Sequence, residues 1–117
     1  MNEFLLIFRR DYLTNEKQPT PEQMEAHLVR WQEWFRTLAA GDHLARQLQR
    51  WDNIGKLIHS DGKAAGGPYT EIKESIGGII IIWASHYDEA IETAKGCPIY
   101  ELGGNVEIRM GGLSREQ

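Results

Sequence analysis

Two short runs of the chain are apolar at every position, which indicates strands that are buried on both faces. Residues 4–8 form the first run, and residues 79–83 form the second, with four consecutive isoleucines before Trp83. β-Branched residues favour strands over helices. Residues 105–110 instead alternate between apolar and charged side chains, which predicts a strand with one face toward water.

A long amphipathic helix is predicted after residue 20. Thr20 is a suitable N-cap, Pro21 fits the first helical position, and Gln23 completes a capping box. Gly41 is a suitable left-handed terminator. Apolar residues recur between these ends at helical spacing, with His27 and Trp34 beside the stripe: Met24, Leu28, Trp31, Phe35 and Leu38.

A second, shorter helix is predicted to begin at Ser85, because Asp88 three residues later reinforces an N-cap. Gly96 and Pro98 end it. Its apolar stripe comprises Tyr87, Ala90, Ile91 and Ala94.

The middle of the chain gives weaker signals. Residues 42–53 fit either a short helix or an irregular strand. Residues 56–59 predict a strand, followed by a tight turn at Asp61-Gly62. Residues 64–68 are small and rich in glycine, and we expect a loop there.

The order of these elements is β-α-β-β-α-β, the ferredoxin-like α+β arrangement. We therefore expect a four-stranded antiparallel sheet with the first and third strands in its centre. The strand at residues 56–59 and the last strand are expected at its edges. One domain over residues 1–110 and a flexible tail over residues 111–117 complete the prediction.

Strands that are apolar on both faces imply a partner, because two helices cover only one face of such a sheet. Burial of one aliphatic side chain is worth about 1.5–3 kcal/mol, so an uncovered row would be costly. We expect a second copy to cover it in a homodimer, and the alternative is a cover of long loops. The row is expected to include several of Leu5, Ile7, Ile80 and Ile82.

Composition and charge narrow the function classes. The net charge is −4 and the basic residues are scattered, which argues against a nucleic-acid partner. The single cysteine, Cys97, fits a reducing compartment. No apolar run is long enough for a membrane span or a secretory signal, so a cytoplasmic location is expected.

His27 is the main candidate for chemistry. Beside the stripe of the first helix, it suits either a general acid/base or a packed residue with one satisfied hydrogen bond. No two histidines have helical metal-ligand spacing, and the glycine-rich segment matches no nucleotide-binding fingerprint, so neither a metal nor a cofactor is expected. Cys97 fits an ordinary small buried residue better than a nucleophile.

Residues 66–78 interleave charges with single apolar residues. They form either a solvated connector or a cleft entrance lined by Tyr69, Glu71 and Lys73. The segment resembles the DGPF branch of the YCII-related family in these matching positions: Gly67, Pro68, Tyr69 in place of Phe, Glu71, Lys73, Glu74, Gly77 and Gly78. The similarity continues at His27-Leu28, at residues 88–90, at Pro98 and at residues 106–109.

The resemblance implies a ferredoxin-like chain that forms a dimeric α+β barrel. Some relatives look like small enzymes with a His–Asp pair, including a dehydrochlorinase of a ring compound. That histidine corresponds to His27, and either Asp42 or Asp11 would be its partner. The chain departs from the pattern at Gly66, where the family has its leading Asp, and at Met110, where it has Pro.

Two functions from different classes are consistent with these residues. The first is a cofactor-independent enzyme in which His27 moves a proton in an isomerisation or elimination on a small organic molecule. The walls of its pocket are expected to come from Trp31, Trp34, Tyr69 and Trp83. The second is a binding or regulatory module without catalysis, which the loss of the Asp at Gly66 favours.

Overall fold

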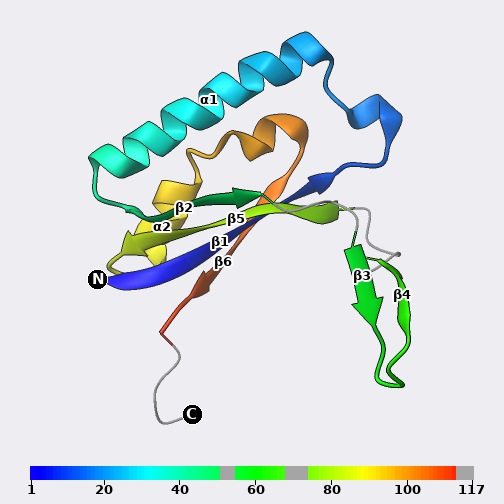
Figure 1. Cartoon of the computed structure of the whole chain (residues 1–117). Coiled ribbons are helices and arrows are strands. Elements are labelled where there is room, and N and C mark those ends of the chain that lie inside the picture. Colours follow the sequence, from blue (N-terminus) through cyan, green and yellow to red (C-terminus); the bar gives the residue numbers. More distant parts are fainter. Residues whose placement is uncertain (51–54, 68–73, 113–117) are drawn as a thin grey trace.

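The computed structural model of the chain describes residues 1–50, 55–67 and 74–112 (Figure 1). The strands are β1 (Asn2–Asp11), β2 (Leu44–Arg50), β3 (Gly55–Ile58), β4 (Ala64–Gly67), β5 (Glu74–Ala84) and β6 (Asn105–Met110). The α-helices are α1 (Pro21–Ala40) and α2 (Tyr87–Ala94), and the 3₁₀ helices are η1 (Asn15–Lys17) and η2 (Pro98–Leu102).

The main sheet has four strands in the order β2-β5-β1-β6, and every neighbouring pair is antiparallel. The two strands with apolar runs, β1 and β5, occupy the centre as predicted. In the register, Leu6 lies opposite Ile80 on one side and Ile108 on the other. The α+β class and the ferredoxin-like sheet expected from the sequence are confirmed.

Both α-helices contribute to the core on one face of the sheet, and Figure 1 shows α1 above that face. Phe4, Leu6 and Phe8 of β1 point into this layer, each no more than 2% exposed. They meet Ile80 and Ile82 of β5, which are equally buried. The helices complete the core with Trp31, Trp34 and Leu38 from α1 and Ala90 and Ala94 from α2.

Helix α1 begins as the sequence predicts. The Thr20 side chain accepts a hydrogen bond from the Gln23 amide, and the Gln23 side chain accepts one from the Thr20 amide. The end of the helix differs from the expectation. Gly41 has a φ of −91°, and the following Asp42 takes the left-handed conformation with a φ of 56°. An aspartate tolerates that region better than most residues other than glycine.

The second strand of the sheet is not the segment that the sequence favoured. Residues 44–50 pair with β5 as β2, which resolves the ambiguous stretch after α1. The segment predicted at residues 56–59 is indeed extended as β3, but it pairs with β4 in a separate two-stranded sheet. The expected loop at residues 64–68 is wrong over Ala64–Gly67, because the turn at Gly62 (φ 84°) folds this segment back onto β3.

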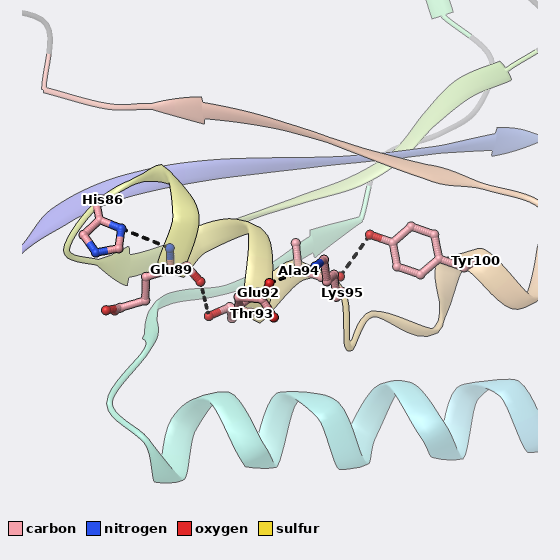
Figure 2. Close-up of polar contacts among 7 residues, drawn as sticks. All are labelled: His86, Glu89, Glu92, Thr93, Ala94, Lys95 and Tyr100. Carbon is pink, nitrogen blue, oxygen red and sulfur yellow. Dashed lines mark hydrogen bonds and ion pairs between the residues drawn. The ribbon is translucent and has the colours of Figure 1, made fainter.

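Helix α2 begins one residue later than predicted. The N-cap is His86 and not Ser85, and the His86 ring accepts a hydrogen bond from the Glu89 amide (Figure 2). At the other end of the helix, the Tyr100 hydroxyl donates to the Ala94 carbonyl at 3.0 Å (Figure 2). Of the predicted apolar stripe, Ala90 and Ala94 are buried.

The second face of the main sheet carries the other half of the apolar positions. Leu5 lies opposite Ile81, and Ile7 lies opposite Ile79, so these four side chains share the face that points away from the helices. The expectation for Ile80 and Ile82 is wrong, because both lie on the helix-covered face. The described residues place no helix over the second face (Figure 1).

Some expectations are not decided by this architecture. No helix within the described residues is long and apolar enough to cross a membrane. The domain boundary at residue 110 stays a prediction, and residues 113–117 of the expected tail lie outside the described part.

The turn after β1 is organised by one carboxylate. Asp11 Oδ1 accepts hydrogen bonds from the amides of Leu13 and Thr14, at 2.8 and 3.0 Å. Its Oδ2 accepts a third from the Thr14 hydroxyl at 2.7 Å. These bonds, with the Thr14 hydroxyl first, lower the pKa of Asp11 from 3.8 to about 2.

This shift predicts a stability change in acid. Because the folded pKa lies below the unfolded value, Asp11 stabilises the fold fully above pH 3.8 and loses this contribution as the pH falls toward about 2. Asp11→Asn should therefore melt below the wild type at pH 6, and the gap should shrink in acid. Thermal unfolding of both proteins between pH 6 and pH 2.5 measures it. A gap that stays constant or grows in acid would contradict the assignment.

Candidate functional site

Both ring nitrogens of His27 are engaged by neighbouring side chains. The residue lies in the second turn of α1 and is only 3% exposed. Its Nδ1 is 2.9 Å from Glu101 Oε2, and its Nε2 is 2.7 Å from Trp31 Nε1. An indole nitrogen only donates, so Nε2 must be the acceptor. The network therefore places the ring proton on Nδ1, where it is donated to Glu101.

Glu101 is shared between His27 and Arg30. It lies on η2, and its Oε1 is 2.6 Å from Arg30 Nε, one helical turn after His27. The hydrogen bond from Arg30, followed by that from His27, lowers the pKa of Glu101 below its usual 4.5. The carboxylate is therefore ionised at neutral pH and fixes the orientation of the imidazole. It is also 39% exposed, so solvent reaches this side of the pair.

Trp31 connects the histidine to the aromatic core. Its ring lies edge-on to Phe8 at a centroid distance of 5.0 Å and to Trp34 at 5.7 Å. It also contacts Phe35 at 5.5 Å. Edge-to-face contacts of this kind hold an aromatic ring in a defined orientation. The indole N–H is thus held against His27 by packing as well as by the hydrogen bond.

Helix η2 holds Glu101 beside His27. The chain approaches β1 closely at Gly104, just after the end of η2. A β-carbon at Gly104 would lie 2.6 Å from the Arg9 carbonyl oxygen and 2.5 Å from an Ile99 side-chain carbon. Only glycine fits such a contact. Ile99 itself is buried, and it anchors η2 in the core from the other side.

The structure locates the residues that the sequence singled out. His27 and Trp31 are brought together. Asp42 is exposed at the far end of α1, roughly 20 Å along the helix from His27 at 1.5 Å per residue. Asp11 is committed to the turn after β1. The carboxylate that bonds His27 is Glu101, so the structure assigns the pair to neither aspartate.

Two of the remaining predicted wall residues, Trp34 and Trp83, are not gathered at His27. Trp34 packs in the core near Trp31. Trp83 is 36% exposed and lies opposite Glu3, on the sheet face that carries Leu5 and Ile81. Tyr69, Glu71 and Lys73 lie outside the described residues, so their predicted part in binding stays a prediction.

Other reactive groups do not add to the site. Cys97 is buried, and burial raises the pKa of its thiol to about 12, which keeps it in the unreactive protonated form. Over the described ranges, no cluster of three His, Cys, Asp or Glu side chains has a geometry suited to a metal ion.

Comparison with known proteins places the chain in a family. The family model of the YCII-related domain matches residues 11–110. The chain belongs to the YCII-related family. A search of the curated proteins finds no match.

One solved structure of similar fold is a 5-chloro-2-hydroxyhydroquinone dehydrochlorinase from Burkholderia phenoliruptrix AC1100, in complex with 2,5-dihydroxybenzoquinone. It has a TM-score of 0.50 and 18% sequence identity, and the match covers 97% of each chain. At this identity the likeness supports the fold of this YCII-related chain and no specific activity.

The hydrogen bonds of His27 predict its tautomer. In ¹⁵N-labelled protein at pH 8, the long-range ¹H–¹⁵N spectrum should show His27 with a protonated Nδ1 and an unprotonated Nε2. The His27→Gln variant assigns the signal. Glu101→Gln should keep this tautomer, because Trp31 still donates to Nε2 and the glutamine side-chain oxygen can accept from Nδ1. A wild-type ring protonated at Nε2 would contradict the network.

Proposed function

We propose that this YCII-related protein is a small, cofactor-independent enzyme in which His27 transfers a proton in an isomerisation or elimination. The observation that carries the proposal is the pair formed by His27 Nδ1 and Glu101 Oε2 at 2.9 Å. A carboxylate in this position orients an imidazole and stabilises the imidazolium that forms when Nε2 takes a proton. The similar fold of a dehydrochlorinase is consistent with elimination chemistry.

The step can be written for Nε2 as the base. Nε2 takes a proton from an acidic C–H or O–H of the substrate, and the electron pair left behind forms a new double bond. In an isomerisation the proton returns at another carbon, and in an elimination a leaving group departs with its own electron pair. The indole of Trp31 must release Nε2 first, because an N–H donor now occupies that lone pair.

A second candidate is a ligand-binding or regulatory module without catalysis. The Trp31 contact favours it, because the hydrogen bond from Nε1 at 2.7 Å leaves His27 without a free lone pair. In that case His27 would tie α1 to η2 through Glu101 and serve only stability. The two candidates differ in the effect of a His27 substitution on turnover.

The discriminating experiment is a turnover assay with a matched variant. The wild type is incubated with substituted hydroquinones, phenols and small hydroxy acids, including 5-chloro-2-hydroxyhydroquinone, and products are followed by NMR and chloride release. For a substrate that reacts, kcat in His27→Gln should fall by about 10²- to 10⁴-fold while binding persists. Glu101→Gln should give a smaller loss of kcat. No turnover across the panel, or equal turnover by His27→Gln, would favour the binding module.

We also infer that two copies pack through the second face of the sheet. Leu5, Ile7, Ile79 and Ile81 form an apolar strip there. Beside it, the register adds Glu107, which pairs with Arg9 and with Arg109 on the same face. An apolar strip bordered by both signs of charge suits a self-complementary, two-fold interface. A dimeric α+β barrel would result.

This assembly predicts a defined response to substitution. The wild type should sediment as a dimer at micromolar concentration, and Ile81→Asp should sediment as a monomer with its secondary structure retained. Ile91→Asp is the matched control, because Ile91 is exposed on α2, which covers the opposite face. A monomeric wild type would overturn the inference, and a dimeric Ile81→Asp would place the interface elsewhere.

The branch within the family rests on sequence alone. We infer the DGPF-type branch from Gly67-Pro68, Lys73-Glu74 and Gly77-Gly78. The cytoplasmic location stays a prediction that rests on the single cysteine and on apolar runs too short for a membrane span or a secretory signal.

A further inference from the structure

Arg10 is a buried cation without an acidic partner among the described residues. It is 8% exposed and occupies the position after Phe8 on the helix-covered face of β1. Its Nη1 donates to the Gln18 side-chain oxygen at 3.0 Å and to the Asp11 carbonyl at 3.3 Å. The guanidinium also stacks on Tyr12 at 4.1 Å from the ring centroid. All three partners are neutral groups.

Buried guanidinium groups are normally paired with an anion, because removal of the charge from water is costly. The nearest carboxylate in the sequence, Asp11, directs both oxygens at the turn formed by Leu13 and Thr14. Each salt bridge found in the described part of the chain involves another cation. Among the side chains that the structure describes, no carboxylate therefore balances the charge of Arg10.

The guanidinium also keeps donors that a ligand can reach. Arginine has five N–H donors, and the hydrogen bonds of Arg10 all come from Nη1. No fully buried side-chain nitrogen or oxygen among the described residues lacks a hydrogen-bond partner. Nε and Nη2, which have no such partner, must therefore retain access to solvent. This edge of the guanidinium suits bidentate binding of a carboxylate.

Arg10 lies in the same layer as His27. Phe8 precedes it on the same face of β1, roughly 7 Å along the strand, and the Phe8 ring packs against Trp31. Trp31 in turn bonds His27. The β-carbon of Arg10 lies against Gly104, just after the helix that carries Glu101. Gln18, its hydrogen-bond partner, lies three residues before the start of α1, the helix that holds His27.

We propose that Arg10 binds the anionic group of the ligand, a carboxylate or a phenolate, at the site of His27. The ligand is then a small organic anion, and Arg10 sets its orientation toward the base. This inference rests on the proposed function for the place of the ligand, but its test does not depend on turnover.

The test compares an anion with its neutral isostere. Binding of 2,5-dihydroxybenzoate and 2,5-dihydroxybenzamide is measured by calorimetry, with benzoate and 2,5-dihydroxybenzoquinone as further anionic probes. The wild type should bind at least one anion, and the acid about ten- to a hundred-fold more tightly than the amide. Arg10→Gln should lose this preference, and Arg10→Lys should keep part of it. Arg36→Gln, which removes an exposed arginine of α1, should keep all of it.

A spectroscopic measurement covers the case in which Arg10→Gln does not fold. In ¹⁵N-labelled wild type, the Nε–H signal of Arg10, assigned by its absence in Arg10→Lys, should shift on titration with the same anions. Absence of binding by every anion, equal affinity for acid and amide, or an unmoved Nε–H signal would overturn the proposal.

A third variant separates this inference from the proposed reaction. His27→Gln should bind the anion with the preference intact. If His27→Gln keeps this preference but the wild type turns over no substrate, the role of Arg10 in anion binding is supported and the proposed proton transfer is rejected. If a substrate is turned over while Arg10→Gln retains the preference, the reaction stands and the role of Arg10 falls.

Discussion

The inner row of β1 is the constraint on which the rest of the molecule depends. Phe4, Leu6 and Phe8 lie in a central strand, and both helices and both neighbouring strands meet them. Alternation along the strand then makes Arg10 the next inward position. The inward side chains of β1 are thus apolar as far as Phe8 and end with the guanidinium of Arg10. A core that becomes polar at one end is a usual setting for a ligand site.

The histidine pair depends on the same packing. Trp31 packs against Phe8 of β1 and against Trp34 and Phe35 of α1. Its indole N–H then donates to Nε2 of His27. Glu101 fixes the other side from a short helix that approaches β1 at Gly104. The imidazole orientation is therefore set by three separate segments of the chain. The imidazole is thus held in one geometry, with its Nε2 lone pair occupied by the Trp31 N–H.

The sequence predicted the features that depend on residues close to one another along the chain. The capping box at Thr20 and the doubly apolar strands β1 and β5 arise from short-range chemistry, and they placed the centre of the sheet correctly. The choice of second strand failed, because both Leu44–Arg50 and Gly55–Ile58 are extended and only tertiary pairing distinguishes them. His27 was found from its place on α1. Glu101 was missed, because it lies 74 positions away and no local pattern links the two. The inward position of Arg10 could have been predicted, because it follows Phe4, Leu6 and Phe8 at two-residue spacing in the strand.

The β3–β4 hairpin lies outside the four-stranded sheet. The 23 residues between β2 and β5 (51–73) include both hairpin strands, which pair with each other and not with the four-stranded sheet. Strand β2 pairs directly with β5, so this pairing does not involve the hairpin strands. Surface connections of this kind accept insertions and deletions readily. A change in the length of the turn between β3 and β4 would therefore leave the pairing of β2 with β5, and the framework around His27, in place.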